Sequence, residues 1–163
     1  MQLTTKVRKN TAILLAAAAI ALATTACFPD SAPGQPSDSY AAGIFQAVNQ
    51  DRANNGLPAL GYSPKLTNQA GNWAWQMMHD NTLYHQNLSA LLSSSDYSNY
   101  YTLGENIIVA PGNYTPAQLE AAWMASAPHR ANILSSSFNV MGTGEVWGPD
   151  GRVWAVVDFG GLS

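Results

Sequence analysis

The sequence predicts an α+β domain in which helices pack on a small sheet, and three observations support this fold class. Apolar residues recur at helical spacing over 41–48 and again over 66–78. Two β-rich apolar runs, 138–147 and 152–159, flank the turn-forming tetrapeptide Gly148-Pro149-Asp150-Gly151, which is typical of a hairpin. Helices followed by a terminal antiparallel hairpin indicate a layered α+β arrangement.

Start and stop signals bound the predicted helices. The first helix begins near Tyr40 and ends before Gly56, because glycine is favoured just beyond a helix C-terminus. The pairs Ser63-Pro64 and Thr115-Pro116 each place an N-cap hydroxyl before a proline at the first helical position, so they start the second and third helices. Ser126 is expected to cap a further short helix in the same way.

The middle of the chain has a weaker pattern. Ser, Asn and Tyr dominate residues 81–101, which indicates a loop with a short helix over 88–92. A β-rich apolar run over 104–110 predicts a strand. On the third helix, we expect Glu120 to lie on the polar, solvated face.

Residues 1–26 predict a signal peptide. Three basic residues lie within the first nine positions, and an Ala/Leu/Ile run over 11–23 follows them. This run is too short for a comfortable permanent membrane span, and small residues end it as they do at a cleavage site. The alternative is an uncleaved anchor helix.

Cys27 is the only cysteine, so it cannot form an internal disulfide. Its place directly after the apolar run resembles a bacterial lipobox, although Thr24 stands where that pattern has Leu, Val or Ile. We expect a lipidated Cys27 and a Pro/Ser-rich tether over 27–39, followed by the folded domain over 40–163. The protein is then exported, either as a cell-membrane lipoprotein that faces outward or, after ordinary cleavage, as a secreted protein.

The charge balance argues against nucleic acid as a partner. Without the three basic residues of the signal peptide, four basic residues remain against ten acidic ones, a net charge of −6 (4 − 10). The remaining four are scattered, whereas nucleic acids and anionic lipid head groups both bind clustered Lys and Arg. We therefore expect no nucleic-acid binding, and membrane attachment through a lipid anchor.

An ordered set of short motifs runs through the domain. In chain order these are Asn49, Arg52, Gly56, Leu57, Leu60, His85, Gly104-Glu105-Asn106-Ile107, Trp123, Ser126, His129-Arg130, Asn132-Ile133-Leu134, Gly142, Gly144 and residues 156–160. In order and spacing the set resembles the bacterial extracellular branch of the CAP superfamily, named after cysteine-rich secretory proteins, venom antigen 5 and plant pathogenesis-related proteins. The resemblance covers about residues 40–161.

This resemblance implies a three-layer α-β-α sandwich with a cleft in which His85, Glu105 and His129 converge. Family members carry two histidines and two acidic residues there, often with a divalent metal ion. In this chain Ser126 stands where the second glutamate is expected. The implied cleft is therefore reduced to one acid, with Ser126 and Trp123 beside it.

Two imidazoles and a carboxylate suit Zn²⁺ or another divalent metal with an open fourth position. Such an ion could polarise a water molecule, with Glu105 as the general base. In the first turn of a short helix, the positive end of the helix dipole would keep His129 neutral. The alternative is that Glu105 and His129 belong to a buried polar network with no ligand.

Four other residues have simpler interpretations. An N-cap role accounts for Ser126, and no Gly-x-Ser-x-Gly elbow surrounds it as a nucleophile. Trp123 belongs either to the core or to the cleft wall, and Arg130 is expected to pair with a carboxylate or a carbonyl. His79 is expected to have a structural role at the surface.

Three functions are compatible with these features. The leading one is an extracytoplasmic module that binds a lipid or a small hydrophobic molecule, because the resemblance implies such ligands and no shared reaction. The alternative is a metal-assisted hydrolase, a peptidase or a cell-wall-active enzyme, that uses Glu105. A third is an interaction module for envelope proteins, with an inert cleft.

Overall fold

The computed structural model describes Pro36 and residues 38–163. The predicted signal peptide over 1–26, the lipidated Cys27 and nearly all of the tether lie outside the described residues. Within the described part, no helix combines the length and the apolar character that a membrane crossing requires.

Five helices and four strands build the domain. The helices are α1 (Ser39–Asn54), α2 (Pro64–Asp80), α3 (Leu88–Leu92), α4 (Pro116–Ala125) and α5 (Ala127–Ile133), with a short 3₁₀ turn η1 (Ser95–Tyr97) after α3. The strands are β1 (Gly61–Tyr62), β2 (Tyr100–Pro111), β3 (Val140–Trp147) and β4 (Arg152–Leu162). The predicted helices, the loop helix over 88–92 and the hairpin are all present.

The four strands form one sheet in the order β1-β3-β4-β2. The short strand β1 runs parallel to β3, while β4 is antiparallel to both β3 and β2. The strand β2 begins four residues before the predicted start because Tyr100 already pairs with Leu162 at the end of β4. Since β2 lies at the edge of the sheet, one side of its backbone remains open to partners other than strands.

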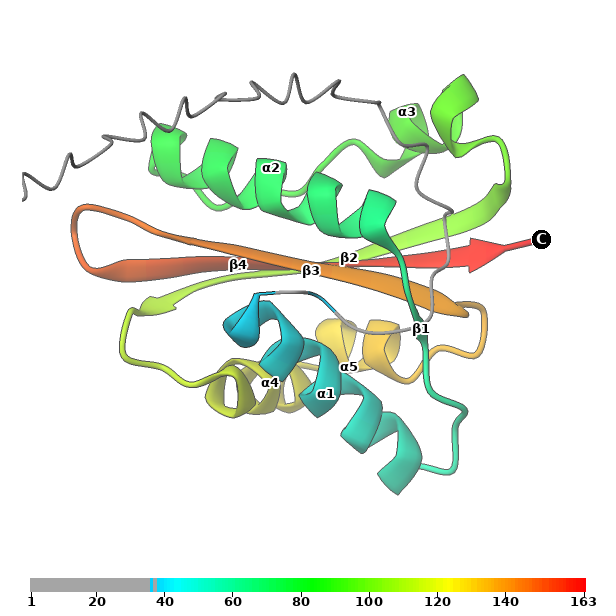
Figure 1. Ribbon diagram of the computed structural model, residues 1–163, viewed down its shortest axis with the longest axis horizontal. Helices are drawn as coiled ribbons and strands as arrows, with labels where there is room; N and C mark the ends of the chain where they lie inside the picture. The colour runs from blue at the N-terminus through cyan, green and yellow to red at the C-terminus, as the bar shows by residue number, and fades with distance from the viewer. Residues whose placement is uncertain (1–35, 37) are drawn as a thin grey trace, which may run out of the picture.

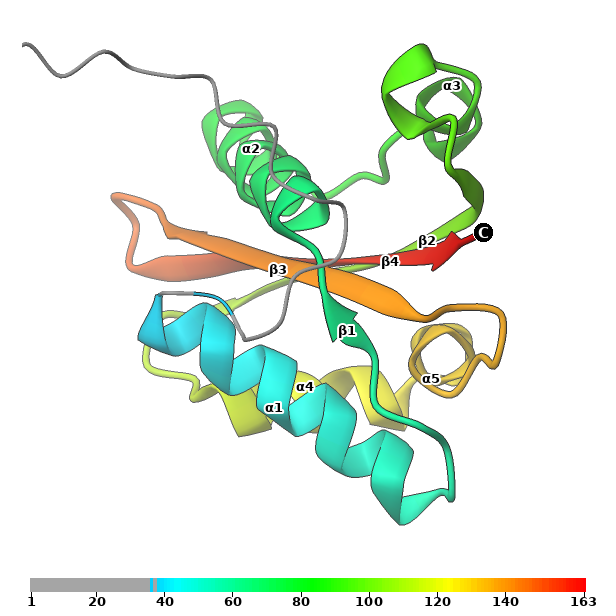
Figure 2. The same ribbon diagram turned by 45° about the vertical axis from the view of Figure 1, so that its right-hand side comes forward.

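Helices cover both faces of this sheet, as Figures 1 and 2 show. α2 and α3 lie on one face, and α1, α4 and α5 lie on the other. The arrangement is the three-layer α-β-α sandwich that the resemblance implied. Side chains of β4 alternate between the layers: Trp154 and Val156 pack toward α2, and Val157 and Phe159 join the core on the α1 side.

Local sequence accounts for the helix starts. Ser63 Oγ accepts a hydrogen bond from the Leu66 amide, and Thr115 forms a capping box with Gln118, so both predicted caps are confirmed. Asp38, which the sequence pattern did not single out, caps α1 by accepting from two amides. These caps fix where each helix meets the sheet.

Two glycines of β3 allow α2 to lie directly on the sheet. A Cβ atom at Gly142 or at Gly144 would collide with the α2 backbone. This close approach gives both motif glycines a packing role.

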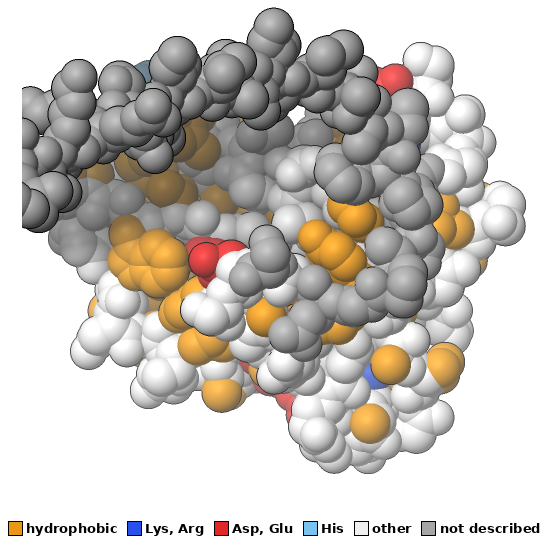
Figure 3. Space-filling model, viewed as in Figure 1, with side chains coloured by type: hydrophobic (Ala, Val, Ile, Leu, Met, Phe, Trp, Pro, Cys, Tyr) orange, Lys and Arg blue, Asp and Glu red, His pale blue; other side chains and the backbone are white. Residues whose placement is uncertain are grey.

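Charged side chains are sparse on the visible described surface in Figure 3, where uncharged polar and apolar groups predominate. This pattern follows from a composition with only 10% charged residues. The few charged groups that are buried therefore identify places where the fold makes specific polar contacts.

Candidate functional site

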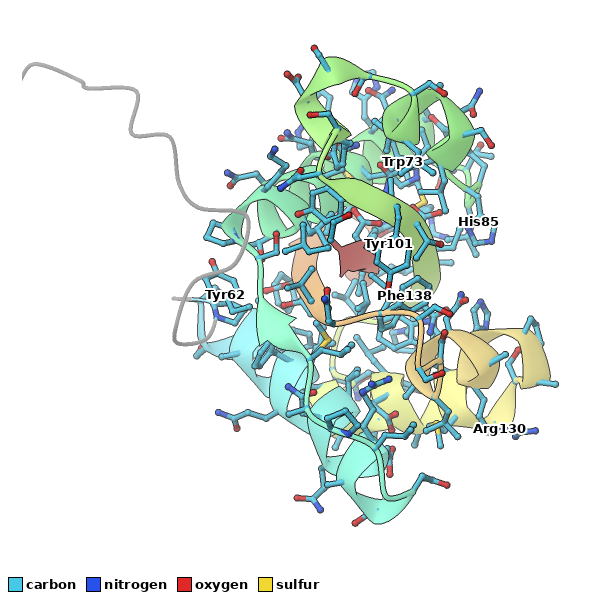
Figure 4. All side chains as sticks on the ribbon, turned by 90° about the vertical axis from the view of Figure 1, so that its right-hand side faces the viewer. Tyr62, Trp73, His85, Tyr101, Arg130 and Phe138 are labelled. Carbon is cyan, nitrogen blue, oxygen red and sulfur yellow. The ribbon has the colours of Figure 1, made fainter. Side chains whose placement is uncertain are left out.

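The edge strand β2 carries the centre of the candidate site. Glu105 and Asn106 are neighbours on this strand, so their side chains point to opposite faces of the sheet. Glu105 points toward the loop that follows α2, and Asn106 points toward α5. In Figure 4, His85 and Arg130 lie on the same side of the molecule, with the sheet between them.

Glu105 holds His85 by a short hydrogen bond. His85 Nδ1 lies 2.6 Å from Glu105 Oε1, and the side chain of His85 is 58% exposed while that of Glu105 is 1% exposed. A carboxylate only accepts hydrogen bonds, so the imidazole donates through Nδ1. The nitrogen of His85 that remains available to a ligand is therefore Nε2.

Gln86 fixes the carboxylate from behind. Its backbone amide donates to Glu105 Oε1 at 3.1 Å, and its side-chain amide donates to Glu105 Oε2 at 2.7 Å. The same Nε2 group also donates to Asp158 Oδ1 at 2.9 Å. Gln69 donates in turn to the side-chain oxygen of Gln86. A buried amide thus links two acids that face each other across β2 and β4.

The α5 side is attached to the strand by two asparagines. Asn132 Nδ2 donates to the backbone oxygen of Glu105 at 3.0 Å and to Asn106 Oδ1 at 2.9 Å. Asn106 Nδ2 donates to the backbone oxygen of His129 at 3.0 Å. These bonds satisfy polar groups at the sheet edge and place His129 in the first turn of α5, as expected from the sequence.

The pKa values of His129 and Asp158, which lie on different sides of the site, shift in opposite directions. Burial and, to a smaller extent, the charge of nearby His85 lower the pKa of His129, which favours its neutral form. Burial and, after it, the charge of Glu105 raise the pKa of Asp158 well above its usual value, which favours its protonated form. The causes at His129 are thus burial and an imidazole neighbour rather than the helix dipole alone.

We name His85, Glu105 and His129 the histidine site. The described residues contain no group of three or more His, Cys, Asp or Glu side chains placed to hold a metal ion. Glu105 is buried and already accepts three hydrogen bonds, so it is arranged to orient His85. The donor set therefore does not fit a metal site with these three residues as ligands.

Trp123 and Ser126 take up different positions from the implied cleft lining. Trp123 is 1% exposed in the core, where its indole donates to the Ile107 carbonyl at 3.1 Å, so it is a core residue rather than a cleft wall. Ser126 stands at the N-cap position of α5, but its hydroxyl makes no capping hydrogen bond. The extended backbone and Pro128, not a hydroxyl cap, therefore start this helix.

The sequence-based expectation for Glu120 was wrong. Glu120 is buried, and desolvation together with a hydrogen bond to Asp51 raises its pKa to about 8. It lies between α4 and α1, so two faces of α4 are packed instead of one. Arg130 donates to the Met124 carbonyl at 2.8 Å, and His79 lies at the surface beside Asp80, in agreement with the simpler interpretations.

Sequence reasoning missed the polar residues that hold the site together. Gln86 directly follows His85, and Asn106 directly follows Glu105, yet neither type of residue signals a buried role by itself. Asp158 lies within the motif over 156–160, but the sequence alone does not place its side chain. A sequence signal existed for both Asn106 and Asn132, because both belong to the ordered motif set.

The whole domain matches a family model. The model described as the cysteine-rich secretory protein family (CAP) matches residues 45–159. The chain belongs to this family. The CAP domain thus provides the scaffold on which the histidine site is built.

Similar proteins agree with this assignment. The protein YkwD of Bacillus subtilis is 33% identical over 129 residues, which are 76% of this chain and 48% of YkwD. The chain therefore spans about half the length of this curated relative. An outer surface protein of Borrelia burgdorferi has the same fold, with a TM-score of 0.64 at 16% identity over 74% of this chain and 90% of that one.

Two further solved structures share this fold. An extracellular protein with an SCP domain from Bacillus anthracis gives a TM-score of 0.56 at 24% identity, over 71% of this chain and 38% of that one. The protein NaASP2, whose structure was determined with Zn²⁺, gives a TM-score of 0.54 at 13% identity, over 80% of this chain and 85% of that one. At these identities the likeness shows the fold alone.

Proposed function

We propose that this chain is an exported CAP-domain binding module that takes a lipid or small hydrophobic ligand with its polar end at the histidine site. The observation that carries the proposal is the 2.6 Å contact between His85 Nδ1 and buried Glu105. This contact fixes Nδ1 of His85 and leaves Nε2 of the exposed imidazole free to contact a ligand. His129 lies nearby, and its lowered pKa favours the neutral form.

The proposed location is the outer face of the cell envelope. The predicted signal peptide over 1–26 and Cys27 directly after it favour an anchored lipoprotein, and release after cleavage is the alternative. Structures of similar fold come from proteins described as extracellular and as an outer surface protein. Envelope proteins remain the second class of partner for a domain in this place.

The geometry favours binding over hydrolysis. A general base needs a carboxylate oxygen that can reach a water molecule, whereas Glu105 is 1% exposed and engaged by His85 and Gln86. Ser126 stands where the resemblance implies a second acid, so this position supplies no carboxylate for that role. The metal-assisted hydrolase stays a prediction that no described contact favours.

Binding of a zinc ion at the histidine site also stays a prediction. NaASP2 was crystallised with Zn²⁺, but among the described residues of this chain no group of three or more His, Cys, Asp or Glu side chains is placed to hold a metal ion, and His85 and His129 supply two nitrogens. Two nitrogen ligands fall short of the three that zinc sites with an open position use. We therefore expect Zn²⁺ titrated into the full chain to bind weakly, and calorimetry checks this.

Lysophosphatidylglycerol below its micelle concentration is a suitable probe of the proposed ligand class. We expect it to shift the ring signals of His85 and His129 in NMR spectra of the full chain. His85→Asn keeps an amide N–H for Glu105 but removes the ring nitrogen Nε2, so it is expected to abolish binding without unfolding the domain. Gln50→Ala, an exposed change on α1, is the control.

Either of two results contradicts the proposal. One is a lipid that leaves both imidazole signals unmoved at saturating concentration. The other is undiminished binding to a folded His85→Asn variant, because the free ring nitrogen would then have no part in recognition.

A further inference from the structure

A pocket lies apart from the histidine site, at the end of the sheet that carries the turn between β3 and β4. It is formed where the C-terminal end of α2 approaches the turn between β3 and β4, both at the same end of the sheet in Figure 1. Its volume is about 470 Å³, within the range of small-ligand sites. The lining residues are Met78, His79, Asn81, Gly148, Pro149, Asp150 and Trp154.

The floor of this pocket contains an indole N–H without an acceptor. Trp154 is 2% exposed, and among the described residues no hydrogen bond from its Nε1 is present. The indoles of Trp73, Trp123 and Trp147 behave differently, since each donates to a backbone carbonyl at 2.9–3.1 Å. A donor in this position favours a ligand that brings a carbonyl or hydroxyl oxygen.

Gly148 keeps the approach to this indole open. A Cβ atom at Gly148 would lie 2.9 Å from Asp150 Oδ1, 3.4 Å from Met78 Cγ and 3.5 Å from Trp154 Nε1. Met78 and Pro149 supply apolar lining to the same pocket, and the Arg152 guanidinium lies 4.9 Å from the centroid of the Trp154 ring. A small group with one oxygen and one methyl fits this combination of a single donor and apolar walls.

The rim of the pocket is suited to a polyhydroxylated ring. His79 lines the pocket, and its ring stacks on Trp75 with 5.1 Å between the centroids; Trp75 is 52% exposed. Aromatic faces of this kind pack against the apolar C–H face of a sugar ring. Across the pocket, Arg152 donates to Asp150 and to Asn81, which holds oxygen acceptors in place for hydroxyl groups.

We propose that this pocket binds an N-acetylated hexosamine unit of a glycan. The acetamido carbonyl accepts from Trp154 Nε1, the acetamido methyl packs between Met78 and Pro149, and the sugar ring lies toward the rim. The site is independent of the histidine site, because Trp154 precedes Asp158 by four residues on β4 and none of its lining residues contacts Glu105.

N-acetylglucosamine titrated into the full chain tests the proposal by NMR. We expect the Trp154 indole N–H signal to shift, with glucose, which lacks the acetamido group, binding about tenfold more weakly or not at all. N-acetylalanine amide, which has the acetamido group without a sugar ring, distinguishes an acetylated peptide from a sugar as its source. It is expected to bind more weakly than N-acetylglucosamine.

Gly148→Ala is the decisive variant because it fills the space before the indole at an exposed turn. It is expected to weaken N-acetylglucosamine binding at least about tenfold, whereas Trp147→Phe, the control on the same hairpin, should leave binding unchanged. Equal binding of glucose, an unmoved Trp154 signal in the wild type, or undiminished binding to folded Gly148→Ala would each overturn the proposal. Equal or tighter binding of N-acetylalanine amide would overturn the sugar assignment.

Discussion

Glu105 differs from Glu120 and Glu145 in the neighbours that its carboxyl group meets. Glu105 accepts three hydrogen bonds from His85 and Gln86. Glu120 faces Asp51 and Glu145 faces Asp38, and burial together with the second carboxyl raises the pKa of each glutamate to about 8. Glu120 and Glu145 each also have one buried oxygen without a partner among the described residues.

This difference teaches that burial alone does not identify a functional carboxylate. The Glu105 carboxylate is surrounded by hydrogen-bond donors from His85 and Gln86, and it fixes the exposed imidazole of His85 in one orientation. Glu120 and Glu145 each share a hydrogen bond with a second acid, Asp51 and Asp38 respectively. These two acid pairs join α1 to α4 and the start of α1 to β3. We propose that the first arrangement serves recognition at the surface, whereas the second joins elements of the fold.

Removal of Glu105 should have the largest effect. Glu105→Ala removes the acceptor of the Gln86 backbone amide, one of the two acids that accept from the buried Gln86 side chain, and the partner of His85, so we expect a loss of about 3 kcal/mol in the free energy of unfolding. Urea denaturation measures it. Asp96→Ala, which removes an exposed carboxylate, is the control and should change stability by less than about 0.5 kcal/mol. Equal losses of stability in the two variants would contradict a special structural role for the buried, hydrogen-bonded carboxylate of Glu105.

Glu120 and Glu145 should contribute much of the pH dependence of stability, beside Asp158, whose pKa is also raised in the folded chain. The folded pKa of about 8 of the two glutamates lies above the ordinary value of 4.5, so the folded chain retains protons that the unfolded chain releases. The free energy of unfolding should therefore fall as pH rises from about 4.5 to about 8, and stay level above that. Urea denaturation across this range checks the decline.

The matched variant carries Glu120→Gln and Glu145→Gln together. Glutamine keeps the shape of a protonated carboxyl, so this variant should show a smaller decline, with the remainder from Asp158, and be more stable than the wild type at pH 8. A decline of unchanged size in the double variant would place its origin in other groups.

The smallest expected effects compare two serines at helix starts. Ser63 caps α2 through its hydroxyl, so Ser63→Ala should cost about 1 kcal/mol. Ser126 makes no capping bond, so Ser126→Ala should stay within about 0.5 kcal/mol. Thermal unfolding of both variants tests whether the capping hydrogen bond, rather than the presence of a serine, decides how much an N-cap residue contributes to stability.

The layered fold was predictable because its signals are local. Ser63-Pro64, Thr115-Pro116 and the turn at 148–151 each specify a boundary through backbone chemistry, and each lies where the sequence predicted it. The two-residue strand β1 was not predictable, since two residues carry no periodicity. Its pairing depends on β3, about eighty positions later.

The site was predictable only in part. The motif order pointed to His85, Glu105 and His129, but the depth of Glu105 and its bonds with Gln86 arise from tertiary packing. The same limit explains Glu120. Its neighbour Leu119 marks the apolar face of α4, and nothing local reveals that α1 also covers the position next to it.

The most direct test of the account is the tautomer of His85 in the folded chain. Ring ¹⁵N shifts report which nitrogen of the neutral imidazole carries the proton. We expect the proton on Nδ1, held by Glu105, with Nε2 free, and we expect Glu105→Gln to weaken this preference. A proton on Nε2 in the wild type would mean that Glu105 does not orient the ring, which would contradict the account of the histidine site.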